Sequence, residues 1–135
     1  MMETGKLIYE YCLLRYVPDI EREEYVNVGL MMMCKKLRWM RVAIHIDEER
    51  IHALSLKADT DRLRTQLSIF ERNDVPESGL PVEERYRWMA AVKSAIIQTS
   101  PSHPGILRHP GDIPSSDLIS LLDNKFQSLF SSLVL

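Results

Sequence analysis

The chain has 135 residues and a mass of 15.7 kDa, the size of one domain, and its 45% hydrophobic and 27% charged residues are typical of a globular protein rather than a disordered one. A formal net charge of -2 argues against a general attraction to nucleic acid or to anionic membranes. The sequence contains no long apolar run and no basic-then-apolar leader, so we expect a cytoplasmic protein that does not enter a membrane.

The first third of the chain predicts a three-stranded antiparallel meander. Aromatic and aliphatic residues alternate in its first and third segments, as in half-buried strands. The middle segment is almost entirely apolar, which predicts a central strand buried on both faces. The connections are short and polar, and Pro18 ends the first strand. The expected strands are residues 7–17, 25–34 and 38–46.

The rest of the chain predicts a mixture of helix and strand. Asp59 is typical of an N-cap residue, and Pro81 is typical of the first turn of a helix. A final Leu- and Phe-rich stripe at helical spacing predicts a long amphipathic helix. The expected elements are a short fourth strand at 51–56, a helix from Asp59 to about Arg72, a loop at 73–79, a second helix from Pro81 to about Val92, a strand at 94–100, a Pro- and Gly-rich surface loop at 101–114, and a helix from Ser116 through Leu133.

These elements predict an α+β fold. We expect an antiparallel sheet of three to five strands that begins with the N-terminal meander, with about three helices packed on one face. One domain is expected over residues 1–135, with the meander in residues 7–46 and a helical and mixed second half in residues 59–133.

Strand alternation divides the meander into an aliphatic face and an aromatic, partly polar face. The aliphatic face, which the helices are expected to cover, contains Ile8, Cys12, Leu14, Val26, Val28, Leu30, Met32, Met40, Val42, Ile44 and Ile46. The opposite face contains Tyr9, Tyr11, Leu13, Arg15, Tyr25, Asn27, Gly29, Met31, Met33, Trp39, Arg41, Ala43 and His45.

The predicted register places Arg15, Asn27 and His45 in one row across the aromatic face. A cation, an amide and an imidazole would then lie beside the space left by Gly29, which is the composition of a shallow binding groove. Gly29 is expected in the next row, between Leu13 and Ala43. A plainer alternative is that Gly29 only makes room for packing and that Arg15 pairs with a nearby glutamate.

The sequence offers no standard motif for metal binding or catalysis. The four histidines are scattered, and no Gly-rich phosphate loop or nucleophile elbow is present, so we expect no metal and no cofactor. Cys12 and Cys34 lie about five positions out of register in the predicted hairpin, at roughly 3.3 Å per residue, so we expect free thiols rather than a disulfide.

A candidate binding surface combines the polar row with neighbouring charges and with residues from the second half of the chain. Its members are Arg15, Arg22, Glu24, Asn27, Gly29, His45, Arg85, Trp88 and His103.

Three stretches of the chain resemble a bacterial family known as domain of unknown function 3037. The first stretch contains Tyr9, Tyr11, Leu14, Arg15, Tyr16, Val17, Pro18, Arg22, Glu23, Glu24, Tyr25, Asn27, Val28 and Gly29. The second stretch contains Glu84, Arg85, Tyr86, Arg87 and Trp88, followed by Ser94, Ser100, Pro101, His103, Pro104 and Gly105. The third stretch is the closing Leu/Phe helix. The resemblance implies no established activity and no catalytic residues. Because members of that family are often encoded beside HipA-like kinase proteins of the toxin–antitoxin type, it implies an accessory role with a protein partner.

Three functions are consistent with these observations. The first is a non-enzymatic accessory module that binds a protein encoded nearby through the aromatic sheet face or an open sheet edge. The second is a small hydrolase or nucleotide-handling enzyme that uses Arg15, Asn27 and His45. The third, less expected from the charge, is binding of single-stranded nucleic acid by Tyr and Trp side chains on the open sheet face.

Overall fold

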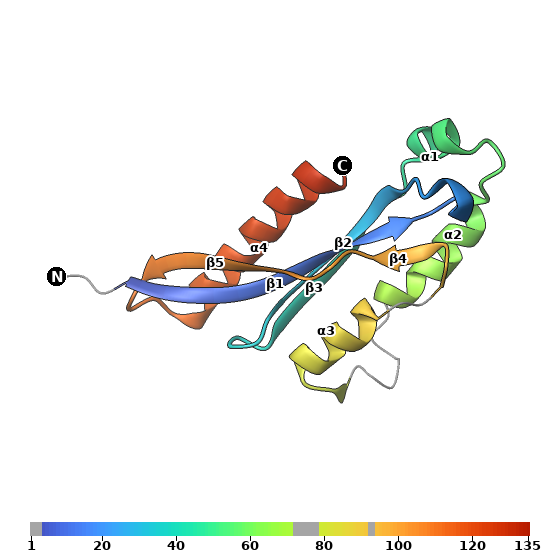
Figure 1. Cartoon of the computed structure of the whole chain (residues 1–135). Coiled ribbons are helices and arrows are strands. Elements are labelled where there is room, and N and C mark those ends of the chain that lie inside the picture. Colours follow the sequence, from blue (N-terminus) through green and yellow to red (C-terminus); the bar gives the residue numbers. More distant parts are fainter. Residues whose placement is uncertain (1–3, 72–78, 92–93) are drawn as a thin grey trace.

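The computed structural model describes residues 4–71, 79–91 and 94–135 (Figure 1). Within them the chain folds into an antiparallel sheet and a set of helices, and the α+β class predicted from the sequence is confirmed. The elements are β1 (Thr4–Tyr16), the 3-10 turn η1 (Ile20–Arg22), β2 (Val26–Cys34), β3 (Trp39–Ile44), α1 (Glu48–Leu54), α2 (Thr60–Leu67), η2 (Ser68–Glu71), α3 (Val82–Ala90), β4 (Ile97–Thr99), β5 (His103–Pro110) and α4 (Ser115–Leu133).

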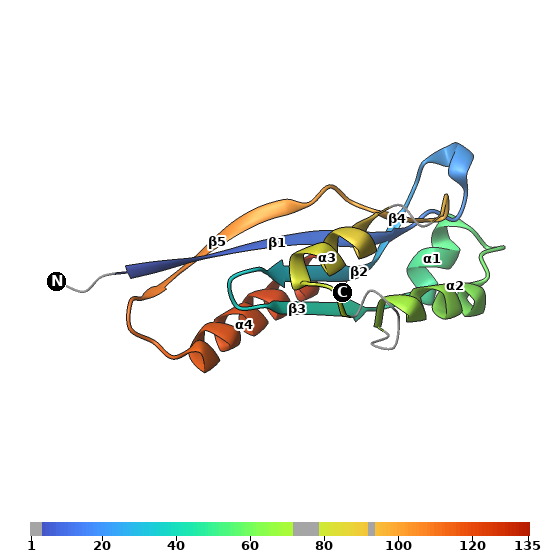
Figure 2. The same ribbon diagram turned by 90° about the horizontal axis from the view of Figure 1, so that it is seen from below.

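The 13-residue strand β1 is the centre of the sheet. On one side it pairs with β2, from Glu10 to Tyr16, and β2 pairs in turn with β3. On its other side β1 pairs first with β5 and then, near Tyr16, with the short strand β4. The N-terminal half of β1 therefore continues together with β5 beyond the end of the β2–β3 hairpin, as Figure 2 shows.

Helices cover both faces of the central strands, whereas the sequence analysis placed them on one face. On the first face α1, α2, η2 and α3 pack against a cluster that includes Cys12, Leu14 and Met31. On the second face α4 packs against Leu7, Leu30 and other residues (Figure 1). Because both of its faces are covered, β2 is buried along almost its whole length, which confirms the burial predicted for the central strand.

A β-bulge in β2 explains why the predicted faces of that strand were wrong. Leu14 pairs with Gly29 but Arg15 pairs with Asn27, so Val28 is an extra residue opposite β1. A shift of one residue moves each following side chain to the other face of the sheet. The residues that change faces are Gly29, Leu30, Met31, Met32 and Met33.

The short fourth strand predicted at residues 51–56 is wrong, because this segment belongs to helix α1. Asp47 caps the helix by accepting a hydrogen bond from the Arg50 N–H (3.1 Å), and two glutamates occupy the first turn. Ile51 is the buried contact of α1 with the core. The N-cap and the acidic first turn therefore favour a helix here more strongly than the short apolar pattern favours a strand.

The loop predicted at residues 101–114 is also wrong, because eight of its residues form β5. Gly105 lies opposite Tyr9, and Gly5 lies opposite His109. A Cβ atom on either glycine would overlap the aromatic ring across from it, so each ring covers its glycine partner. The prolines at both ends of β5 are tolerated because they lie on an edge strand.

The remaining predicted elements agree with the structure to within a few residues. Asp59 caps α2 through a 3.0 Å hydrogen bond from the Arg62 N–H, as predicted, and α4 ends at Leu133. Pro81 and Pro114 occupy N-cap positions, so α4 starts one residue before the predicted cap at Ser116. β4 is shorter than the predicted strand at 94–100. Arg72, Val92 and residues 73–78 of the predicted loop lie outside the described residues.

Candidate functional site

The structure brings Arg15 and Asn27 together, as the sequence predicted, at the end of the β1–β2 pair. The guanidinium carbon of Arg15 lies 4.3 Å from the centre of the Tyr25 ring, a cation–π contact. His45 follows β3 and is exposed, and its backbone N–H donates to the Val28 carbonyl (2.9 Å). Within the described residues no hydrogen bond joins His45 to Arg15 or Asn27.

Asn27 holds the end of helix α4. Its Nδ2 donates to the carbonyl oxygen of Leu133 (3.0 Å), and Arg50 Nη1 donates to the carbonyl oxygen of Val134 (3.1 Å). The last carbonyls of a helix have no partner within the helix and attract positive charge, so both contacts stabilise the C-terminus of α4. The amide of the predicted polar row therefore has a structural partner. Two buried polar atoms of this row, Arg15 Nε and Asn27 Oδ1, have no hydrogen-bond partner among the described residues.

The other predicted surface residues lie on separate elements. Gly29 is buried against Leu14 in the core, where a Cβ would lie 2.8 Å from Leu14 Cδ1. Arg22 and Glu24 form an exposed ion pair (2.6 Å) beside η1. The His103 ring lies 5.3 Å from the Tyr11 ring at the start of β5. The last two members, both on α3, are Arg85 and Trp88.

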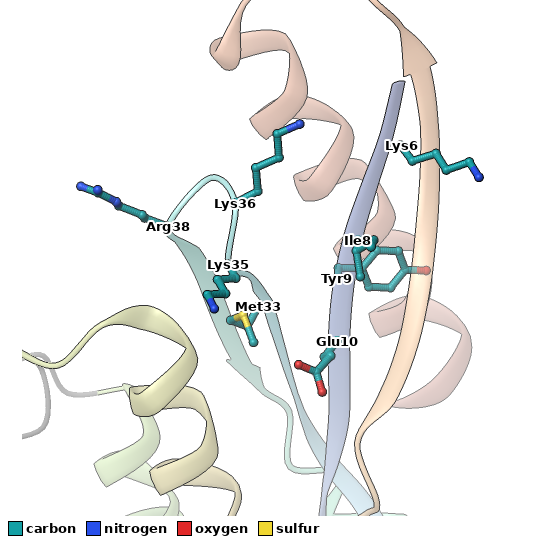
Figure 3. Close-up of a pocket in the computed structure, with 8 residues that line it drawn as sticks. All are labelled: Lys6, Ile8, Tyr9, Glu10, Met33, Lys35, Lys36 and Arg38. Carbon is teal, nitrogen blue, oxygen red and sulfur yellow. The ribbon is translucent and has the colours of Figure 1, made fainter. Parts of the chain in front are cut away.

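A groove of about 610 Å³ lies between the N-terminal half of β1 and the turn that joins β2 to β3 (Figure 3). In Figure 3 the side chains of Glu10, Met33 and Lys35 meet between these two segments, whereas Arg38 extends away from the turn. The lining residues are Lys6, Ile8, Tyr9, Glu10, Met33, Lys35, Lys36 and Arg38. A second groove of about 710 Å³ shares Lys35 and Arg38 and reaches the start of α3.

The rim of the β1 groove is strongly basic. Lys6, Lys35, Lys36 and Arg38 are all exposed, and within the described residues none of them forms an ion pair. The turn closes with a 3.1 Å hydrogen bond from the Arg38 N–H to the Lys35 carbonyl. Arg38 has a φ of 51°, a left-handed conformation that non-glycine residues adopt at a cost. The turn therefore displays a cation at a position where glycine would be easier to accommodate.

An apolar pair lies on the sheet surface beside this rim. Ile8 and Ile106 face each other across β1 and β5 and are 62% and 54% exposed. The next cross-strand pair on the same face is Lys6 with Arg108, and both of these side chains are exposed. This end of the sheet thus offers an apolar centre flanked by positive charge, a composition typical of interaction surfaces.

The one carboxylate among the groove-lining residues already has partners. Glu10 Oε2 lies 3.3 Å from Arg87 Nη2, and Glu10 Oε1 accepts a hydrogen bond from Ser102 Oγ (3.1 Å). The Ser102 hydroxyl also lies 2.8 Å from the Tyr86 hydroxyl. These contacts join β1, α3 and the start of β5, and none of them involves a cation of the rim.

The thiol of Cys12 and the hydroxyl of Tyr86, both buried near Glu10, stay protonated near neutral pH. Burial raises the pKa of the Cys12 thiol to about 11 and raises the pKa of the Tyr86 hydroxyl. A thiol with a raised pKa is a poor nucleophile, so Cys12 is suited to core packing rather than to covalent chemistry. Both cysteines are free and buried, on opposite faces of the sheet.

In residues 4–71, 79–91 and 94–135, no three His, Cys, Asp or Glu side chains lie close enough together to hold a metal ion. None of the helices in the same residues is long and apolar enough to cross a lipid bilayer.

The basic rim was not predicted from the sequence, although the sequence contains a signal for it. Lys35, Lys36 and Arg38 place three cations within four residues at a hairpin turn. Lys6 joins them only because β1 extends past the end of β2, and this length difference was not predicted.

A family model described as "Protein of unknown function (DUF3037)" matches residues 11–124. The chain belongs to this family. The DUF3037 match confirms the resemblance drawn from the three sequence stretches, and it extends from the middle of β1 into α4. No curated protein and no solved structure matches the chain.

Proposed function

We propose that this DUF3037 chain is a non-enzymatic accessory module that binds another protein through the groove between β1 and the β2–β3 turn. The observation that supports this proposal is the exposed apolar pair Ile8 and Ile106 beside four exposed cations that form no ion pair within the described residues. Elsewhere α4 and the α1–α3 helices cover the sheet. Exposed apolar side chains next to a groove favour binding of a macromolecular surface.

The partner that we favour is a HipA-like kinase-type protein encoded nearby, as the family resemblance implied. When the tagged chain is produced together with that protein, the two are expected to elute in size-exclusion chromatography as one complex with the summed mass. Separate elution at micromolar concentrations of both proteins would argue against this partner.

The enzymatic hypothesis has less support from the same contacts. The amide of Asn27 donates a hydrogen bond to the Leu133 carbonyl oxygen, and the guanidinium of Arg15 packs on the Tyr25 ring. His45 is exposed beyond the end of β3. Asn27 and Arg15 therefore make structural contacts, and the three side chains do not converge on one ligand position.

The nucleic-acid hypothesis needs an open aromatic sheet face. The structure covers that face with α4, and Tyr9 is only 6% exposed. The Trp39 ring packs edge-on against Phe126 of α4. Since stacking of bases requires accessible rings, the covered face favours protein binding over this alternative.

A further inference from the structure

One edge of β1 is open beside the groove. Residues 4–9 of β1 pair with β5 on one side, whereas pairing with β2 begins only at Glu10. Among the described residues, no strand pairs with residues 4–9 on the β2 side. An open strand edge presents backbone N–H and C=O groups that another extended chain can bind.

This edge lacks the prolines that protect the neighbouring edge. β5 carries prolines at two positions of its eight residues, which hinder pairing with a further strand. The segment of β1 from Thr4 to Tyr9 contains no proline. The groove of about 610 Å³ lies along this edge, between it and the β2–β3 turn, so there is open space next to the edge.

We propose that an acidic, extended segment of the partner protein adds to residues 4–9 of β1 as a strand, in the groove between β1 and the β2–β3 turn. This inference rests on the proposed function and adds the binding mode and the chemistry of the partner. Six residues of β1 span about 20 Å, which accommodates a partner strand of about six residues.

Charge determines the kind of segment that fits. The position of the added strand is bordered by the cations of the rim, Lys6, Lys35, Lys36 and Arg38. The carboxylate of Glu10 already forms an ion pair with Arg87 and accepts a hydrogen bond from Ser102. A segment with carboxylates would compensate these cations, whereas a basic or neutral segment would leave them unpaired next to the interface. Complementary charge favours acidic residues, above all near the β2–β3 turn.

Side-chain alternation adds an apolar requirement. On one face the added strand would lie beside Ile8, which is largely exposed, and on the other face beside Leu7 and Tyr9, which pack with α4. Lys6 lies two residues from Ile8 and therefore on the same face, so this face of the segment needs an apolar side chain beside Ile8 and a carboxylate beside Lys6. Along that face the segment therefore alternates apolar residues with glutamate or aspartate.

A second copy of this chain is the other natural occupant of an open strand edge. Pairing two β1 edges would bring two copies of the Lys6, Lys35, Lys36 and Arg38 rim close together. Like charges that meet at an interface oppose association, so the charge distribution favours an acidic partner over self-association.

A synthetic peptide tests the inference without the natural partner. The probe is a fluorescently labelled eight-residue peptide with the sequence Glu-Thr-Val-Thr-Glu-Thr-Val-Thr, in which glutamate and valine alternate on one face of the strand, and the control peptide has lysine in place of glutamate. We expect the glutamate peptide to bind at micromolar to submillimolar concentration in an anisotropy titration, and to lose affinity as salt increases. Equal binding of both peptides, or no binding at millimolar concentration, would overturn the inference.

Charge-reversal variants locate the site. The double variant K35E/K36E is expected to weaken binding of the glutamate peptide at least tenfold. The variant K57E/R62E changes the net charge equally but lies near Tyr16, at the opposite end of β1, and should bind within about twofold of the wild type. Equal losses in the two variants would show that only net charge matters and would reject the site.

Hydrogen exchange tests the strand pairing itself. Backbone amides in residues 4–9 that point to the open edge should exchange quickly in the free protein and slowly in the peptide complex. Unchanged exchange in the saturated complex would reject strand addition. A concentration-dependent dimer that protects the same amides without peptide would assign the edge to self-association instead.

The two proposals fail in different ways. If the HipA-like protein forms a complex that K35E/K36E does not weaken, the accessory function stands and the binding mode is wrong. If the peptide binds as described but no complex forms with the HipA-like protein, the binding mode stands and the proposed partner is wrong.

Discussion

Cys12 and Tyr86 are buried acids whose side chains interact in the core between β1 and α3. Burial raises the pKa of both groups, so the folded chain keeps them protonated at a pH where the unfolded chain ionises them. The unfolded thiol titrates at about 9.0 and the unfolded phenol at about 10.0. The stability contributed by the protonated groups is therefore fully present below pH 9 and is lost as the pH rises.

We accordingly expect alkaline destabilisation that begins near pH 9. Between the unfolded pKa of 9.0 and the folded pKa of about 11, Cys12 alone lowers the free energy of unfolding by roughly 2–3 kcal/mol. Urea denaturation at pH 7.5, 9, 10 and 11 measures this slope. The variant Cys12→Ala removes the thiol and should flatten the part between pH 9 and 11, whereas an identical slope would assign the effect to the tyrosines.

Gly29 is required by packing rather than by ligand binding. A Cβ at this position would lie 2.8 Å from Leu14 Cδ1 and 3.0 Å from the Ala43 carbonyl oxygen. Leu14 is fully buried in the core, so its side chain has little room to move aside. Gly29→Ala should lower the free energy of unfolding by about 1–3 kcal/mol, measured by urea denaturation.

A double-mutant cycle with Leu14→Ala provides the control for Gly29. Removal of the Leu14 side chain makes room for the new methyl group, so Gly29→Ala should cost less in that background. An equal cost in both backgrounds would mean that the Ala43 carbonyl, not Leu14, opposes the methyl group.

At the scale of elements, the anchoring of α4 depends on two side chains from other elements. Asn27 of β2 and Arg50 of α1 donate to the last carbonyls of the α4 segment. Asn27→Ala and Arg50→Met should each lower the free energy of unfolding by about 0.5–1.5 kcal/mol and speed amide exchange at residues 130–135. Arg22→Ala, which removes an exposed ion pair, serves as the control and should change stability by less than about 0.5 kcal/mol. Unchanged exchange at residues 130–135 in both anchor variants would show that packing alone holds α4.

At the β2–β3 turn, two substitutions of Arg38 separate the effect of backbone strain from the effect of charge. Arg38→Gly relieves the positive φ and should raise the free energy of unfolding by about 0.5–1 kcal/mol, while it weakens binding of the glutamate peptide. Arg38→Ala removes the same cation but keeps the strain, so it should weaken binding without a gain in stability. If both variants bind the peptide as well as the wild type, Arg38 does not belong to the site.

Elements whose pattern is local were predictable from the sequence. The meander, the cap at Asp59 and the final helix depend on alternation, capping and helical spacing, which the chain contains within a few residues. β5 was not predictable in this way, because Gly105 becomes acceptable only opposite the Tyr9 ring and the prolines only on an edge strand. The bulge at Val28 likewise depends on how β1 pairs with β2 and not on the composition of β2 alone.

At the scale of the whole molecule, the candidate site results from unequal strand lengths. β1 has 13 residues and β2 has nine, so one end of β1 extends beyond the hairpin and meets no partner on that side among the described residues. The sequence predicted that Arg15 and Asn27 would oppose each other, since both flank one connection. It did not predict the groove, because the groove depends on the registers of three strands at once.

This arrangement predicts that binding and stability depend on different faces of the same strand. Ile8 and Ile106 are mostly exposed, so the double variant I8T/I106T, which keeps β-branched side chains, should change the free energy of unfolding by less than about 0.5 kcal/mol. The same variant should weaken binding of the glutamate–valine peptide several-fold, since it removes the apolar contact. Leu7→Ala on the opposite face, where Leu7 is fully buried under α4, should instead cost about 2–5 kcal/mol. Urea denaturation and anisotropy titration of the three proteins separate these effects, and a large loss of stability in I8T/I106T would show that the pair supports the fold and is not kept exposed for a partner.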